Sequence, residues 1–153
     1  MVDRRTSLSG LATDRAEAPR VTVVIVTYQS EGEIGRCLAA LRASEMPVSV
    51  VVIDNASGDG SADEAEAAGR GMDLRVVRND ANTGFAKAVN QGIELVTTDL
   101  VLVLNPDCYV RPDTMLDGQF DFPQRAVVLA TILRRAGSMN DLAGFLASND
   151  TYY

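Results

Sequence analysis

The feature that most constrains the fold is a set of four short apolar runs, each of which stops at a cluster of polar turn residues. The runs are 21–27, 48–53, 74–78 and 100–104, and Val, Ile and Leu dominate them. A continuous apolar run of this length, without alternation, is typical of a strand that is buried on both faces of a parallel sheet. A fifth strand is predicted at Ala126–Leu133.

The segments between these runs have helical periodicity. Apolar side chains recur on one face at Ile34, Cys37, Leu38 and Leu41, and again at Phe85, Val89, Ile93 and Val96. An Ala-rich segment after Ser61 predicts a shorter helix that glycines 69 and 71 close, and Pro112 predicts the start of another. The pairs Ser30–Glu33 and Ser61–Glu64 have the spacing of capping boxes.

Alternating strands and helices predict right-handed βαβ units. We therefore expect an α/β fold, a three-layer α/β/α sandwich with a mostly parallel, Rossmann-like sheet. The expected organisation is a polar tail at 1–20, one domain at 21–135, and a remnant or C-terminal tail at 136–153. The tail lacks the apolar core of a signal peptide, and the apolar runs are too short to cross a bilayer.

Charge and composition exclude several classes of function. The chain has 14 Lys and Arg against 21 Asp and Glu, a net charge of -7, which argues against nucleic-acid binding. It has no His, which removes Ser-His-Asp and Cys-His mechanisms and His-ligated zinc. Cys37 and Cys108 lack metal-ligand spacing, and we interpret them as reduced thiols, which favours a cytoplasmic location. Neither a dinucleotide-binding glycine fingerprint nor a P-loop is present.

Ligands of parallel sheets bind outside the carboxyl ends of the strands, so the residues just after the apolar runs are the candidates. Asp54 offers a carboxylate to a ribose or a base, or it caps a turn. Asn105 and Asp107 offer oxygen ligands to Mg²⁺ or Mn²⁺, or they form a β-turn with the proline between them. The segment 82–90 opens a helix whose N–H groups face a phosphate, or it is an ordinary amphipathic helix with an N-cap. Each motif taken alone favours the structural interpretation.

Taken in order, these segments resemble the family 2 glycosyltransferases of the GT-A fold. The resemblance rests on Thr27-Tyr28 after the first strand, on Asp-Asn-Ala-Ser-Gly-Asp-Gly-Ser at 54–61, and on Asn-Thr-Gly-Phe-Ala at 82–86 with Asn-Gln-Gly at 90–92. It ends with Leu-Asn-Pro-Asp at 104–107, and the last two motifs look most like the rhamnosyltransferase-type members.

The resemblance implies roles for these residues. Thr27 and Tyr28 line the nucleobase pocket, and Asp54 hydrogen-bonds the base. Asp107 lies where the family binds its metal, with Asn105 beside it in place of the Asp that many relatives have. The other implied donor-site residues are Asp59, Gly84 and Asn90.

The implied activity is inverting transfer from a UDP- or dTDP-sugar, with Mg²⁺ or Mn²⁺, to a glycan or polyprenyl-linked acceptor. It would take place in the cytoplasm at the inner face of the membrane; peripheral membrane association and a homodimer are both compatible with it. No carboxylate after Asp107 matches the family's catalytic base, so the acceptor half looks cut short and the catalytic residue stays unknown.

Three alternatives stay open. The first is an inactive or binding-only fragment that keeps the donor pocket. The second is a nucleotidyltransferase, which should carry a glycine-rich basic loop after the first strand, where 29–33 is acidic. The third is a purely structural domain, which leaves the polar motifs at the strand ends unexplained.

Overall fold

The computed structural model describes residues 21–98, 100–113 and 133–134. Its elements are β1 (Val21–Thr27), α1 (Glu33–Arg42), β2 (Val48–Asp54), α2 (Ser61–Ala68), β3 (Asp73–Arg78), α3 (Phe85–Glu94), β4 (Leu100–Leu104) and β5 (Leu133–Arg134). The four predicted apolar strands and the three predicted helices between them are therefore confirmed. The tail at 1–20, most of the predicted fifth strand, the helix predicted from Pro112 and the segment 136–153 lie outside the described residues.

The strands form one sheet in the order β3-β2-β1-β4-β5. Neighbours from β3 to β4 are parallel, and β5 pairs antiparallel with the start of β4. The predicted mostly parallel sheet is confirmed. In the register of the sheet, Thr27 lies beside Asp54 at the carboxyl ends of β1 and β2, so the polar segments that follow these strands begin at one edge.

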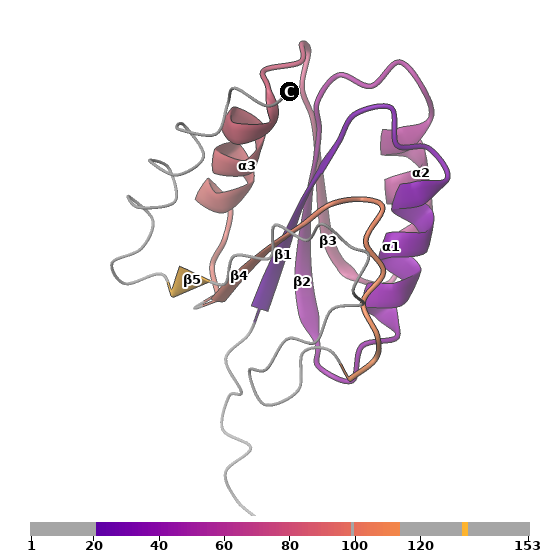
Figure 1. The fold of residues 1–153 in the computed structure, drawn as a ribbon, viewed down its shortest axis with the longest axis vertical. Helices are drawn as coiled ribbons and strands as arrows, with labels where there is room; N and C mark the ends of the chain where they lie inside the picture. Colours follow the sequence, from indigo (N-terminus) through magenta and orange to yellow (C-terminus); the bar gives the residue numbers. More distant parts are fainter. Residues whose placement is uncertain (1–20, 99, 114–132, 135–153) are drawn as a thin grey trace, which may run out of the picture.

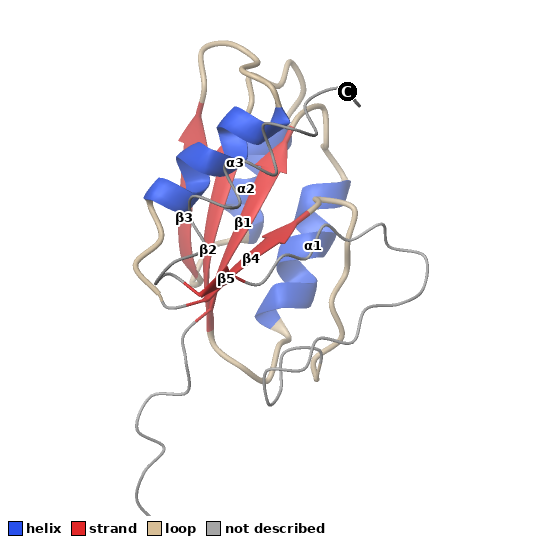
Figure 2. Ribbon diagram, turned by 60° about the vertical axis from the view of Figure 1, so that its left-hand side comes forward, coloured by secondary structure: helices blue, strands red, loops and turns tan. Residues whose placement is uncertain are grey.

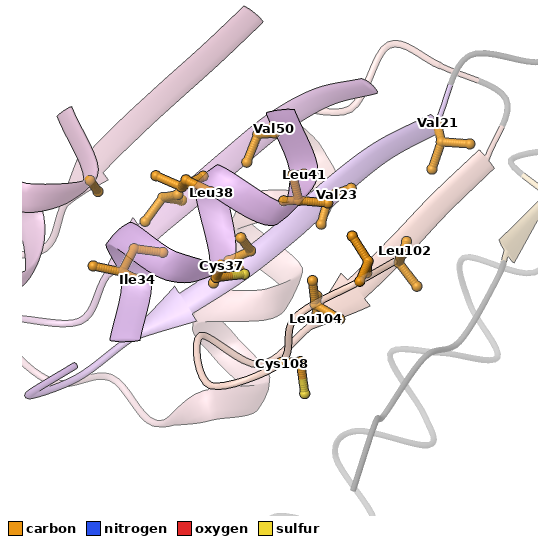
Figure 3. Packing of buried hydrophobic residues seen from close by; sticks show 14 residues of the cluster. Val21, Val23, Ile34, Cys37, Leu38, Leu41, Val50, Leu102, Leu104 and Cys108 are labelled. Carbon is orange, nitrogen blue, oxygen red and sulfur yellow. The ribbon is translucent and has the colours of Figure 1, made fainter. Parts of the chain in front are cut away.

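Helices cover both faces of the sheet, which gives the predicted three layers. Figure 1 shows α1 and α2 on one side of the strands and α3 on the other, and Figure 2 gives a second view of the same layers. The side chains of β1 alternate between two cores: Val23 and Ile25 pack toward α1, whereas Val24 and Val26 pack toward α3. The core beneath α1 continues through Leu104 (Figure 3). Burial on both faces explains why the strands lack polar alternation.

Both predicted capping boxes are wrong. Helix α1 begins after Gly32 and helix α2 after Gly60, and neither N-cap residue makes a side-chain cap hydrogen bond. At the start of α1 the backbone carbonyl of Ser30, not its hydroxyl, accepts the N–H of Ile34.

The start of α2 caps the start of α1 instead. The backbone N–H groups of residues 30, 31 and 32 donate to side chains of the 59–64 segment. The three bonds are Ser30 to Ser61 Oγ at 2.7 Å, Glu31 to Asp59 Oδ2 at 3.0 Å and Gly32 to Glu64 Oε2 at 2.5 Å. Spacing within one helix indicates only local caps, but here the two helix starts lie side by side and the caps cross between them.

None of the helices that the structure describes has the length and apolar character needed to span a membrane.

Candidate functional site

The topology singles out one edge of the sheet as the binding edge. The chain runs outward from β1 to β2 and β3, then returns through α3 to place β4 on the other side of β1. The strand order therefore reverses between β1 and β4, and ligands of open α/β sheets bind outside the carboxyl ends of the strands at such a point. The predicted site residues lie at the ends of β1 and β2 or after β1, β2 and β4, except Gly84 and Asn90, which follow β3.

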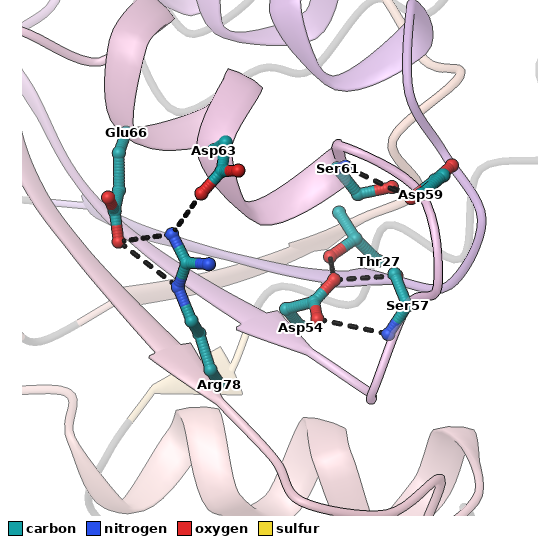
Figure 4. Close-up of polar contacts among 8 residues, drawn as sticks. All are labelled: Thr27, Asp54, Ser57, Asp59, Ser61, Asp63, Glu66 and Arg78. Atoms are coloured by element: carbon teal, nitrogen blue, oxygen red, sulfur yellow. Dashed lines mark hydrogen bonds and ion pairs between the residues drawn. The ribbon is translucent and has the colours of Figure 1, made fainter.

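Asp54 ends β2 as a buried carboxylate with three internal donors, shown in Figure 4. Its Oδ1 accepts from Thr27 Oγ1 at 2.9 Å and from Ser57 Oγ at 2.6 Å, and its Oδ2 accepts from the Ser57 N–H at 3.1 Å. Such bonds compensate the desolvation of a buried charge. Because a carboxylate has about four acceptor positions, one remains for a ligand N–H or O–H.

Thr27, at the end of β1, supports this carboxylate. Its side chain is fully buried, with 0% exposure, and its hydroxyl donates to Asp54. In this structure Thr27 therefore orients Asp54 and does not itself line an open pocket. The next residue, Tyr28, is 53% exposed and presents an aromatic ring at the same edge.

Gln29 ties the exit of β1 to the loop after β2. Its backbone lies in the left-handed region, with φ 53°, and its Oε1 accepts from the N–H groups of Gly58 at 2.9 Å and Asp59 at 3.1 Å. Its own N–H donates to Ser57 Oγ at 3.1 Å. The sequence alone predicts no role for Gln29, because the contacts of its side chain depend on how close the two loops lie.

Asp59 also forms internal hydrogen bonds. Oδ1 accepts from both the hydroxyl and the N–H of Ser61, and Oδ2 accepts from the N–H of Glu31. The hydrogen bond from the Ser61 hydroxyl is the main cause that lowers the pKa of Asp59. In the structure this predicted donor-site residue therefore joins the start of α2 to the loop before α1.

A second group of amides joins the end of β2 to the start of α3, and sequence reasoning missed its centre, Asn55. This side chain is 2% exposed and bonds residues of the 79–83 turn. The available signal was its position next to Asp54 together with the Asn-rich turn, but the partners are 24 or more residues away along the chain.

Gly84 and Asn90 belong to α3. Gly84 is the residue before the helix, with φ 85° and ψ 156°, a conformation that is nearly restricted to glycine. Asn90 is half-buried farther along α3. The predicted N-cap at Asn82 or Thr83 is wrong, because Gly84 occupies that position and no side chain caps it in the usual way.

Asp107 is the exposed one of the three predicted site carboxylates. It follows β4, and within the described part of the chain its side chain accepts only a weak contact from the Cys108 thiol at 3.8 Å. Asn105, two residues earlier, is half-buried, and its backbone carbonyl accepts from the Cys108 N–H at 3.1 Å. Asp54 and Asp59 are held by several donors, whereas Asp107 is open to a cation.

The residues fit a divalent cation that is shared with a ligand. The described residues contain no group of three or more acidic, Cys or His side chains that could enclose a metal by themselves. Mg²⁺ commonly binds through one or two carboxylates together with substrate phosphates and water. Asp107, with the Asn105 amide beside it, suits that mode and not a closed all-protein site.

The two cysteines, Cys37 on α1 and Cys108 next to Asp107, are buried free thiols. Burial is the main cause that raises the pKa of Cys37 to about 12, and burial also raises the pKa of Cys108. They agree with the predicted reduced thiols. The hydroxyl of Tyr109 donates to the Glu33 carboxylate, which fastens the segment after β4 to α1.

Comparison with known sequences gives the following matches. The model of glycosyl transferase family 2 matches residues 22–143. The N-acetylglucosaminyl-diphospho-decaprenol L-rhamnosyltransferase of Mycobacterium tuberculosis is 36% identical over an alignment of 127 residues, and the match covers 73% of this chain and 40% of that protein. The succinoglycan biosynthesis protein ExoU of Rhizobium meliloti is 36% identical over an alignment of 99 residues, and the match covers 63% of this chain and 29% of that protein. The chain thus spans less than half the length of these relatives.

Solved structures have the same fold. The mannosyltransferase PcManGT from Pyrobaculum calidifontis, in complex with GDP-Man and Mn²⁺, has a TM-score of 0.61 and 28% identity, and the match covers 69% of this chain and 32% of that one. S. aureus TarS in complex with UDP-GlcNAc has a TM-score of 0.59 and 28% identity, covering 62% of this chain and 28% of that one. The predicted α/β fold of the glycosyltransferase type is confirmed.

Proposed function

We propose, because the chain belongs to glycosyl transferase family 2, that it binds the nucleotide-sugar donor of an inverting glycosyl transfer. The donor we propose is a UDP- or dTDP-sugar, bound at the edge formed by the carboxyl ends of β1, β2 and β4. The observation that carries this proposal is the contrast between two carboxylates at that edge: Asp54 is buried and held by donors, and Asp107 is exposed.

The nucleoside is assigned to the side of Asp54. A carboxylate fixed by Thr27 and Ser57 can accept one more hydrogen bond, from a base N–H, without reorganising. The exposed ring of Tyr28 offers a stacking surface beside it. Gly84 and Asn90 on α3 are proposed to contact the rest of the donor.

The diphosphate is assigned to the side of Asp107. A chain with a net charge of -7 and acidic residues at this edge needs a positive group to hold a diphosphate. Asp107, with the Asn105 amide, would hold Mg²⁺ or Mn²⁺ there, and the cation would offset charge on the leaving diphosphate. The complex of the PcManGT relative with GDP-Man and Mn²⁺ supports this assignment.

The acceptor we propose is a glycan or a polyprenyl-linked sugar, at the cytoplasmic face of a membrane. The name of the Mycobacterium tuberculosis rhamnosyltransferase, which includes a diphospho-decaprenol, supports a lipid-linked acceptor. The described residues offer no carboxylate that the geometry identifies as the base for the acceptor hydroxyl. Donor binding is therefore the part of the activity for which the described residues supply a site.

Calorimetric titration tests the proposal. UDP, dTDP and GDP are titrated into the full chain with Mn²⁺ and again with EDTA. We expect a pyrimidine nucleoside diphosphate to bind, and EDTA to weaken it. Equal affinity in both conditions removes the metal from the proposal, stronger binding of GDP overturns the donor class, and binding of none of the three refutes the function.

Variants separate the two carboxylates. Asp107→Asn should weaken binding of the nucleoside diphosphate in Mn²⁺ while binding of the uncharged nucleoside is retained. Asp54→Asn should weaken both. The matched control is Asp63→Asn, which removes the same charge from the exposed surface of α2, where Asp63 pairs only with Arg78 in the described structure (Figure 4). Equal effects of all three substitutions would indicate a general charge effect.

A further inference from the structure

The side chain of Asn55 is the centre of a hydrogen-bond network at the end of β2. Its Nδ2 donates to Asn82 Oδ1 at 2.7 Å, and its Oδ1 accepts from the Thr83 N–H at 3.0 Å and from Asn79 Nδ2 at 3.2 Å. The residue is 2% exposed, whereas Asn82 and Thr83 are exposed, so the Asn55 side of these bonds is shielded from bulk water. One amide therefore holds both ends of the 79–83 turn.

The network extends in both directions from this amide. The Asn79 N–H donates to the carbonyl of Asp54 at 2.8 Å, which links the turn to the end of β2. Asn82 Oδ1 also accepts the N–H of Gly84 at 2.9 Å, which links the turn to the start of α3. The two sides of the proposed donor site are thus connected through Asn55.

The orientation of both amides is fixed by backbone donors. The N–H of Gly84 requires an oxygen at the near end of the Asn82 amide, so Asn55 must present its nitrogen to that oxygen. The N–H of Thr83 requires an oxygen at the other end of the Asn55 amide. Position 55 therefore needs one donor and one acceptor, which Asn supplies and Asp does not.

The requirement at position 82 is different. Its Oδ1 accepts from both Asn55 Nδ2 and the Gly84 N–H, and an Asp carboxylate accepts both bonds equally well. The substitution Asn→Asp thus breaks the hydrogen bond between Asn55 and Asn82 when it is made at position 55. The same substitution at position 82 preserves that bond.

We infer that Asn55 is a positioning residue for the donor: it holds Gly84 and the start of α3 at a fixed place relative to Asp54. This inference rests on the proposed function and deepens it. When the amide is in place, the nucleoside side and the α3 side of the site are preorganised, and the donor need not order the 79–84 segment on binding. A nucleoside alone contacts only the Asp54 side and gains little from this arrangement.

The test is NMR titration of the full chain with uridine and with UDP in Mn²⁺. Asn55→Asp should leave the affinity for uridine within about twofold of the parent and weaken UDP about tenfold, because the Asn82 oxygen then faces a carboxylate. Asn82→Asp adds the same charge within the same hydrogen bond and should weaken UDP much less. A merely structural role of Asn55 would lower the affinity for both ligands together.

The outcomes are distinguishable. Failure of the parent chain to bind either UDP or dTDP refutes the proposed function. Binding by the parent with equal weakening in the two variants attributes the effect to charge and overturns the positioning role, as does full UDP affinity in Asn55→Asp. Hydrogen exchange at the Gly84 amide adds a check without ligand: exchange should accelerate in Asn55→Asp, where the carboxylate repels the Asn82 oxygen that accepts this N–H, and not in Asn82→Asp.

Discussion

Thr27→Val isolates the hydrogen bond that fixes the central carboxylate of the site. The Thr27 hydroxyl is fully buried and donates to Asp54 at 2.9 Å, and valine replaces it with a methyl group of similar size. Hydrogen bonds to charged groups contribute about 1.5–3 kcal/mol. Since Ser57 still supplies two donors to Asp54, we expect a loss of about 2 kcal/mol in the free energy of unfolding and not a complete loss of folding.

Thr22→Val is the matched control on the same strand. Thr22 is 2% exposed, and its hydroxyl bonds to the Thr98 hydroxyl at 2.7 Å. Both partners are neutral, and Thr98 keeps a second bond to the carbonyl of Leu100, so the control should lose only about 0.5–1 kcal/mol. Urea unfolding followed by far-UV circular dichroism measures both free energies, with an unchanged denaturant slope expected. A Thr27→Val loss no larger than that of Thr22→Val would refute the charge-assisted role of this bond.

Three further substitutions or treatments probe other parts of the structure. Gly92→Ala should lower the melting temperature, because the new Cβ would overlap a methyl of Val24. Overpacking costs about 1–3 kcal/mol, more than the roughly 1 kcal/mol that alanine gains in helix propensity. A raised melting temperature would contradict this packing. Asp59→Asn should lower the free energy of unfolding at pH 7. The loss relative to the parent should shrink as pH falls through the lowered folded-state pKa of Asp59, since a depressed carboxyl pKa stabilises the fold only above that range. A loss that stays constant from pH 7 to pH 2 would exclude the Ser61 bond as its cause. With a pKa of about 12, Cys37 should react with iodoacetamide at pH 8 only after unfolding, because roughly one thiol in ten thousand is then ionised; mass spectrometry of the native protein would reveal earlier labelling.

The sequence predicts the strands and helices of the described residues closely because their signal is local. Each strand of the parallel sheet is buried on both faces, so its apolar run coincides with its length, and the strand predicted at 48–53 differs from β2 by a single residue. The order of the strands also follows from general rules, since three βαβ connections of one hand leave few arrangements. The carboxyl edge could therefore be identified as the binding edge before any side chain was placed.

The contacts between loops could not be predicted, because they depend on which loops the fold brings together. Ser30 and Glu33 have the spacing of a local cap, yet the donors at 30–32 bond to side chains of the 59–64 segment, 28 or more residues later in the chain. The role of Asn55 could not be predicted from its position next to Asp54 alone, since its partners belong to the turn after β3, 24 or more residues later in the chain. The sequence predicts ligand contacts for the amide and hydroxyl groups of the motifs at the strand ends. In the structure most of these groups bond to one another.

This internal bonding bears on how the motif at 54–61 is interpreted. A polar motif at a strand end has two physical uses: its side chains contact a ligand, or they build the loop that presents other groups to the ligand. Asp59 and Ser61 are used in the second way, because their polar atoms cap backbone N–H groups at the start of α1. Asp54 is used in both ways, since its carboxylate shapes the loop and retains an acceptor position.

Asp107 alone of the three carboxylates has no strong donor within the described structure. A cation that approaches this edge would therefore displace no hydrogen bond at Asp107 stronger than a thiol contact, whereas at Asp54 or Asp59 it would have to disrupt a loop, and this difference in cost favours Asp107 as the metal ligand.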